Sequence, residues 1–135
     1  MIIIPGEPQP QLRSRARVAG KRVIMYDPPK SRKYKEFVKR MAKQQWPSEP
    51  TPAAISLKID IYRPIPKSTS KVRTKKKEEK EIRPIVRPDV DNYAKSILDG
   101  LNGIVFKDDS QIVDMRVRKY YSVKPRVEIQ VKELF

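Results

Sequence analysis

Hydrophobic and polar residues alternate along several stretches of the chain, and this alternation predicts the strands of the fold. In the clearest stretch, Ile55–Tyr62, every second residue is Ile or Leu and mainly polar residues stand between them. A period of two is typical of a strand with one buried face, so we expect a central strand here. The same pattern predicts a long strand beginning at Ile112 and a last strand over Val127–Val131. Shorter strands are expected at Ile2–Ile4 and Val23–Tyr26.

Two other segments repeat their apolar residues at spacings of three and four, which predicts amphipathic helices. The first runs from about Ser31 to about Gln45. The second begins near Asp91 and should stop at Asn102-Gly103, a pair that favours a left-handed turn. At roughly 100° per residue, the apolar arc of this second helix holds Tyr93, Ala94, Ile97, Leu98 and Leu101. The opposite arc, which is free for chemistry, holds Asp91, Asn92, Lys95, Ser96 and Asp99.

The order of these elements predicts the fold class. Helices and strands do not alternate as βαβ repeats, so we expect an α+β fold in which a mixed β-sheet is covered by two main helices. A chain of 135 residues is long enough for one small domain, and we assign residues 1–135 to a single domain. After the second helix, Ile104–Phe106 is expected to form a short strand that leads to Asp108 and Asp109.

Composition narrows the class of function. The chain has 31 Lys and Arg against 16 Asp and Glu, a net charge of +15, which favours a polyanion such as nucleic acid as the partner. It has no Cys and no His, which excludes disulfides, thiolate chemistry and the usual zinc sites. No apolar run approaches the roughly 18 residues of a membrane helix, and we expect a cytoplasmic protein with no membrane partner.

Two basic segments are the candidate nucleic-acid contacts. The first is expected to be a loop after the opening strand, and its candidate residues are Arg13, Arg15, Arg17, Lys21 and Arg22. The second, at about residues 67–87, has strong helix formers but no apolar stripe, so it predicts a solvated helical turn or a mobile arm. Its candidate DNA contacts are Lys75, Lys76, Lys77 and Arg87. A solvated loop and a tether without function are the alternatives for the two segments.

Carboxylates are the candidate chemical groups. Asp89 and Asp91 lie at or just before the first turn of the second helix, and Asp109 belongs to the later acidic pair. Three converging carboxylates would suit Mg²⁺, which takes oxygen ligands and keeps several waters for substrate phosphates. The alternative for the first two is an ordinary helix cap, or an ion pair between Asp91 and Lys95.

The run from Arg87 to Val113, with its Arg-Pro-Asp-Val-Asp-Asn-Tyr-Ala-Lys opening and its Lys-Asp-Asp-Ser-Gln close, resembles the signature of the RusA family of Holliday-junction resolvases. The resemblance implies that Asp89, Asp91 and Asp109 are the metal-binding catalytic acids and that Lys95 is also catalytic. Asn92 and Asp99 match the pattern as well. The resemblance further implies an α+β fold, a homodimer and a four-way DNA junction as substrate.

The carboxylates and the basic charge predict a metal-dependent nuclease, and the resemblance implies a Mg²⁺-dependent endonuclease that resolves Holliday junctions in DNA recombination and repair by paired symmetric nicks. No small-molecule cofactor is expected. Two alternatives stay open at the level of sequence. One is a non-enzymatic basic protein that binds DNA or RNA, which would not need Asp89, Asp91 and Asp109 to converge. The other is a related nuclease that acts on other branched DNA.

Overall fold

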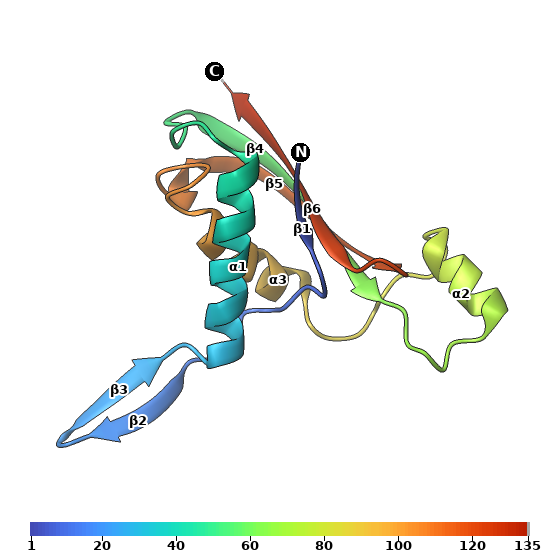
Figure 1. Ribbon diagram of the computed structural model, residues 1–135, viewed down its shortest axis with the longest axis horizontal. Helices are drawn as coiled ribbons and strands as arrows, with labels where there is room; N and C mark the ends of the chain where they lie inside the picture. The colour runs from blue at the N-terminus through green and yellow to red at the C-terminus, as the bar shows by residue number, and fades with distance from the viewer. Residues whose placement is uncertain (135) are drawn as a thin grey trace.

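A mixed four-stranded sheet forms the centre of the protein, whose computed structural model describes residues 1–134 (Figure 1). Its strands are β1 (Ile2–Pro5), β4 (Ala54–Pro64), β5 (Ile112–Ser122) and β6 (Arg126–Leu134), in the order β1-β6-β4-β5. β4 runs parallel to β5 and antiparallel to β6, and β1 is antiparallel to β6. The predicted α+β class and mixed sheet are therefore confirmed.

β4 is an inner strand of this sheet, as its alternating pattern predicts. Ile55, Leu57, Ile59 and Ile61 are at most 1% exposed and belong to the hydrophobic core. Both neighbours of β4 are paired along most of its length, so its backbone groups are satisfied on either side. The sheet edges are β1 and β5.

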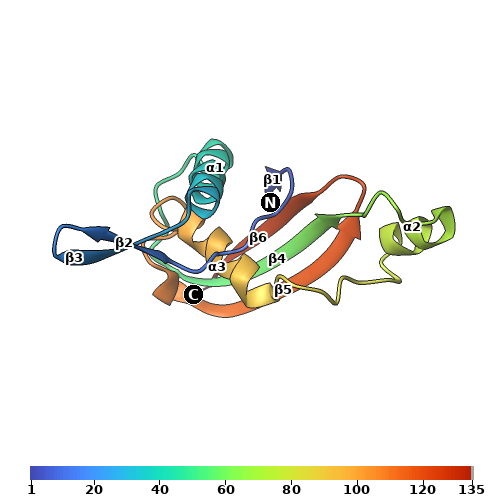
Figure 2. The same cartoon turned by 90° about the horizontal axis from the view of Figure 1, so that it is seen from below.

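Two main helices, α1 (Pro29–Gln45) and α3 (Val90–Leu101), cover the same face of the sheet (Figure 2). Their apolar residues join the strands in one core. The helices are in close contact at Gly100, where an added Cβ would lie 2.5 Å from Cγ1 of Val38. The backbone of α3 can therefore pack against α1 only because this position has no side chain. No helix within residues 1–134 is long and apolar enough to cross a membrane.

The first basic segment forms a β-hairpin that projects beyond the base of α1 (Figure 1). Its strands are β2 (Arg15–Ala19) and β3 (Arg22–Tyr26), and Gly20, with a φ of +63°, opens the two-residue loop between them. The expected strand near Val23–Tyr26 is confirmed, but the expected loop over Arg15–Ala19 is wrong. Alternation on both sides of a Gly-containing loop is a hairpin signal, and the arginines in β2 concealed it.

The second basic segment contains a short helix, α2 (Lys71–Glu78), at the opposite end of the molecule from the hairpin (Figure 1). Ser70 caps it, because the Ser70 hydroxyl accepts a hydrogen bond from the backbone N–H of Arg73. The predicted helical turn is therefore present. It is also in contact with the rest of the fold, since Lys77 is only 8% exposed.

The expected strand at Ile104–Phe106 is wrong, because this segment is a turn. Gly103, with a φ of +80°, provides the left-handed stop after α3, and the N–H groups of Ile104 and Val105 both return to the carbonyl of Leu101. The side chains of Val105 and Phe106 are fully buried, so their apolar character reflects packing under the end of α3. The chain then passes through the 3₁₀ turn η1 (Asp109–Gln111) into β5.

Candidate active site

The N-terminus of α3 presents two exposed carboxylates, Asp89 and Asp91, that form no ion pair within residues 1–134. Asp89 occupies the N-cap position with extended backbone, but its side chain makes no capping hydrogen bond. Asp91 lies in the first turn, and no ion pair within residues 1–134 includes Asp91 or Lys95. Neither the capping role of Asp89 nor the Asp91–Lys95 ion pair is therefore present in the structure.

Lys119 of β5 fixes the backbone that leads into this helix. Its Nζ donates to the carbonyl of Val86 at 2.8 Å and to the carbonyl of Pro88 at 3.0 Å. Partial burial and the neighbouring Arg63 guanidinium lower the pKa of Lys119, while the Asp89 carboxylate acts in the opposite direction. A cation of the sheet therefore lies close to Asp89 and supports the turn from which Asp89 projects.

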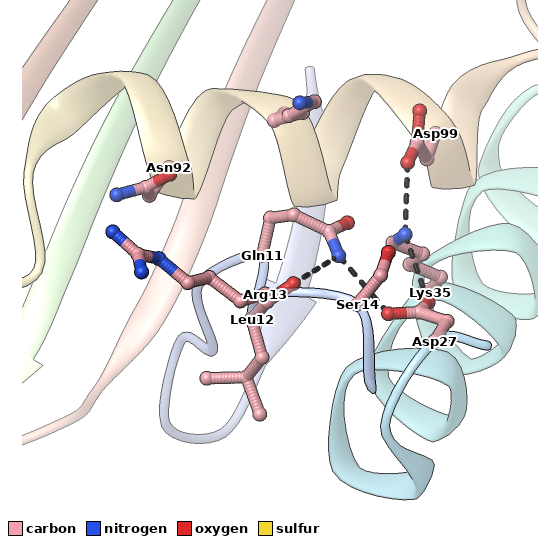
Figure 3. A pocket seen from close by; sticks show the side chains of 9 residues that line it. Gln11, Leu12, Arg13, Ser14, Asp27, Lys35, Asn92 and Asp99 are labelled. Carbon is pink, nitrogen blue, oxygen red and sulfur yellow. Dashed lines mark hydrogen bonds and ion pairs between the residues drawn. The ribbon is translucent and has the colours of Figure 1, made fainter. Parts of the chain in front are cut away.

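A segment from the N-terminal part of the chain runs along the same half of α3. The backbone N–H of Gln11 donates to the carbonyl of Asn92 at 2.9 Å, which holds this segment beside the helix. Together they line two neighbouring pockets, one including Asn92 and Lys95 and the other including Arg87 and Asp89, and Arg13 lines both. Figure 3 shows Arg13 and Asn92 facing one another across the first of these pockets. Basic side chains, Arg13 and Arg87, therefore line the same pocket as Asp89.

Asp99, which shares the polar face of α3, has a structural partner. Lys35 of α1 lies between Asp99 and Asp27, with its Nζ 2.9 Å from a carboxylate oxygen of each (Figure 3). Burial opposes the charge on Lys35, but the hydrogen bonds to Asp99 and Asp27 outweigh it and raise the pKa of Lys35. This ion-pair bridge ties α3, α1 and the end of the hairpin together.

The two aspartates of the later acidic pair differ in their roles. Asp108 is the N-cap of η1, and its carboxylate accepts a hydrogen bond from the backbone N–H of Ser110, which lowers the pKa of Asp108. The carboxylate of Asp109 makes no hydrogen bond or ion pair with the described residues. It lines a third pocket with Leu98 of the last turn of α3.

The expected convergence of Asp89, Asp91 and Asp109 is not seen in the single chain. Within residues 1–134, no three acidic side chains lie close enough together to hold a metal ion. Asp109 emerges beside Leu98 because Ile104–Phe106 turns under the helix end, and Leu98 is about 10 Å along the helix axis from Asp91. The structure places the first two acids on one turn and the third near the opposite end of α3. The donor atoms of Asp89 and Asp91, free carboxylate oxygens, are of the kind that Mg²⁺ prefers.

The candidate DNA contacts occupy three places. Arg13 and Arg87 border the pockets beside α3. The hairpin carries the second group, and all of its members are exposed: Arg15, Arg17, Lys21 and Arg22. Lys75 and Lys76 are exposed on α2. Lys77 differs from them because it is buried, with its Nζ 4.6 Å from the centre of the Tyr121 ring.

Sequence reasoning missed an aromatic pair, Tyr62 and Tyr120. The α2 segment, which is residues 71–83, packs on this pair. Tyr62 of β4 and Tyr120 of β5 are register partners and stack with ring centres 5.3 Å apart. Lys80 and Arg83 lie over the Tyr120 ring at 4.8 Å and 4.1 Å, and Arg126 lies over the Tyr62 ring at 3.9 Å. In the alternation of this strand, Tyr62 stands at a position where the other residues are polar. An aromatic residue there was a signal that this face of the sheet is covered at that end.

Known proteins are similar to this chain over nearly its whole length. The family model for endodeoxyribonuclease RusA matches residues 5–132. The uncharacterized protein YqaN of Bacillus subtilis (strain 168) is 42% identical over 131 residues, which cover 96% of this chain and 92% of that protein. The matched region includes every element from β4 to β5, and therefore both ends of α3 and the acidic residues near them. The chain belongs to the RusA family of endodeoxyribonucleases.

Proposed function

We propose that this protein is a Mg²⁺-dependent endonuclease that resolves four-way DNA junctions by paired symmetric nicks. The observation that carries the proposal is the match of the RusA family model to residues 5–132. The free carboxylates at the start of α3 and the cations beside them support it, because this is the polar composition that phosphodiester hydrolysis at a metal requires.

Asp89 and Asp91 are the proposed primary ligands of the metal. When bound there, Mg²⁺ supplies Lewis-acid stabilisation of the charge on phosphate oxygens. Lys95, one turn beyond Asp91, is free of ion pairs in the described chain, and its ammonium offsets charge that develops in the transition state. Arg13 and Arg87 bind the phosphates on either side of the scissile bond.

Asp109 is the third proposed ligand. Its carboxylate has no partner among the described residues, but it lies beside the last turn of α3. It can therefore join Asp89 and Asp91 only if the segment between α3 and β5 moves when DNA binds, or if a second copy supplies it. A two-fold dimer has a physical reason in this proposal, since two symmetric nicks need two equal sites.

Labelled four-way junction, flap and duplex of matched sequence test the proposal in reactions with Mg²⁺ or with EDTA. We expect paired nicks in the junction in Mg²⁺ only. Cleavage of flap in preference to junction would favour a related nuclease of other branched DNA. Tight binding with no Mg²⁺-dependent cleavage of any substrate would favour the non-enzymatic alternative.

Asp91→Asn tests the site within the same assay. The substitution removes a metal ligand and also one negative charge near phosphate, so cleavage should be lost while junction binding in Ca²⁺ persists or tightens. Glu36→Gln is the matched control, because Glu36 is exposed on α1 and loses the same charge. An Asp91→Asn rate within about tenfold of wild type, about 1.4 kcal/mol in the barrier, would remove Asp91 from the metal site.

A further inference from the structure

The β2–β3 hairpin has two faces of opposite character. Successive residues of a strand point to opposite faces, and cross-strand partners share a face. The register pairs Arg15 with Tyr26, Arg17 with Ile24 and Ala19 with Arg22, and this set forms the cationic face. The remaining pairs, Ala16 with Met25 and Val18 with Val23, form the apolar face, which has no charged residue.

The apolar face is exposed to solvent. Val18, Val23 and Met25 are 77%, 68% and 62% exposed, although apolar side chains of this size are usually buried. The hairpin extends away from the helices and the sheet, and no other element packs extensively on either strand (Figures 1 and 2). A two-stranded ribbon without a core gains no stability from such a face. An exposed apolar face of this kind is typical of a binding surface.

The hairpin is a direct continuation of the candidate active site. The segment that lines the pockets beside Asp89, Asn92 and Lys95 ends at Ser14, and β2 begins at the next residue. At the other end, the Lys35 bridge to Asp27 and Asp99 anchors the return of the chain from β3 into α1. DNA bound at the site would therefore pass alongside the hairpin.

Charge and size favour DNA over a second copy as the occupant. Three arginines on the cationic face and Lys21 in the loop complement phosphate, whereas the same cationic residues of a second hairpin placed here would repel them. The apolar face consists of four side chains, and a stable protein interface buries about 800 Å² on each partner. A two-stranded ribbon is also small enough to enter a DNA major groove.

We propose that the hairpin recognises the branch point of the DNA, with Val18, Val23 and Met25 covering base faces that are unstacked there while the arginines contact phosphates. The proposal rests on the function proposed above. In continuous duplex every base is stacked on both sides, so an apolar side chain can reach a base face only by opening a base step. At a branch point stacking is already interrupted. The apolar face would therefore add affinity for junctions and not for duplex.

The test compares two triple variants of the full-length protein. The apolar-face variant carries Val18→Thr, Val23→Thr and Met25→Gln, which keep side-chain shape and β-propensity at exposed positions. The cationic-face variant carries Arg15→Gln, Arg17→Gln and Arg22→Gln. Each is titrated, with Ca²⁺ in place of Mg²⁺, onto a four-way junction and onto duplex of the same arm sequence, and 2-aminopurine beside the branch point reports base exposure.

We expect the apolar-face variant to lose about tenfold or more in junction affinity, to keep its duplex affinity and to lose the 2-aminopurine response. The cationic-face variant should lose affinity for both DNAs and show a smaller salt slope, because each phosphate contact contributes close to one unit to that slope. Val23→Thr alone should show a smaller change in the same direction and guards against a folding defect in the triple variant.

Three results would overturn the proposal. The first is an unchanged ratio of junction to duplex affinity in the apolar-face variant. The second is conversion of a wild-type dimer to monomers by that variant in sedimentation, which would make the apolar face a contact between copies. The third is wild-type protein that binds duplex as well as junction, which would overturn the proposed function itself and is recognised before any variant is made.

Discussion

Lys119 is the side chain that links β5 to the backbone just before Asp89. It donates to two carbonyls of the segment that precedes α3, and these carbonyls would otherwise have no partner from the sheet. Partial burial and the Arg63 guanidinium lower the pKa of Lys119, and the Asp89 carboxylate opposes this only in part. The backbone that leads to Asp89 is thus supported by a side chain of β5.

Lys95→Gln separates a catalytic from a structural role for the helical lysine. Gln keeps length and helix propensity, and no ion pair within the described residues is broken because Asp99 pairs with Lys35. We expect turnover to fall about 100-fold, roughly 3 kcal/mol, with the melting temperature nearly unchanged. Single-turnover cleavage and thermal unfolding measure the two effects.

Lys39→Gln is the control for this measurement, since Lys39 is exposed on α1 and loses the same charge. If Lys95→Gln lowered the melting temperature while cleavage at low temperature stayed near the wild-type rate, a structural role for Lys95 would be the better account.

For single residues, the sequence predicts which carboxylates are candidate metal ligands. It does not predict which of them lack a hydrogen-bond partner in the folded chain. Asp89 and Asp108 both occupy N-cap positions with extended backbone, yet only Asp108 uses its side chain as a cap. The difference depends on side-chain orientation, which residue types and spacing do not determine. The separation of Asp109 from Asp91 was also beyond the sequence, because it follows from the turn at Ile104–Phe106.

At the scale of elements, the α2 segment is a docked element and not a free tether. Lys77 covers the Tyr121 ring, and Lys80 and Arg83 cover the Tyr120 ring. Glu78 completes the contact, because its carboxylate accepts hydrogen bonds from the Val123 N–H at 2.8 Å and the Ser122 hydroxyl at 3.3 Å. Part of the positive charge of this segment is therefore used to hold the segment in place.

The exposed and the docked lysines should consequently behave differently. Lys75→Ala with Lys76→Ala should lower junction affinity and reduce the salt slope by up to about two units, since each phosphate contact contributes close to one. Lys77→Ala with Lys80→Ala should loosen the segment, because it removes cation–π contacts worth about 0.5–1 kcal/mol each. Titration across a salt series measures the first effect, and hydrogen exchange over residues 71–83 measures the second.

The two double variants could lose DNA affinity equally, without faster hydrogen exchange in Lys77→Ala with Lys80→Ala. All four lysines would then contact phosphate, and the cation–π contacts would not hold the segment in place. A salt slope unchanged in the first pair would leave the hairpin and the residues beside α3 as the source of the binding charge.

Most elements could be predicted because their apolar residues repeat with a clear period. This holds for α1, α3, β4 and β6. The exceptions have physical reasons. β2 has no buried face, and its short alternation of Ala16 and Val18 with arginines is easily overlooked. Ile104–Phe106 is apolar because it fills the core beneath a helix end. A short apolar run alone does not distinguish a strand from a buried turn.

At the scale of the whole molecule, positive charge lies at both ends of the long axis with the acidic turn of α3 between them. The hairpin occupies one end and α2 the other, and α3 lies between them in both views (Figures 1 and 2). A net charge of +15 on so small a chain attracts polyanions over long range and opposes contact between copies.

Self-association and DNA binding should therefore respond to salt in opposite directions. Added salt screens repulsion between copies, so the dimer fraction at fixed protein concentration should rise or hold with salt. Junction affinity should fall over the same series, because bound phosphates release counterions. Sedimentation equilibrium without DNA measures the first quantity, and titration measures the second. A dimer that dissociates as salt rises would instead indicate an interface built on ion pairs.

The parallel pairing of β4 with β5 has a consequence for how the protein folds. The register joins Ile55 to Ile112 and Pro64 to Ser122, so the connection between the two strands contains α2, α3 and all four proposed catalytic residues. Pairings between residues so far apart in the chain pay a large loop-closure entropy and form late. Lys119, which supports Asp89, arrives only with β5. The proposed nuclease site would therefore be among the last parts of the molecule to assemble.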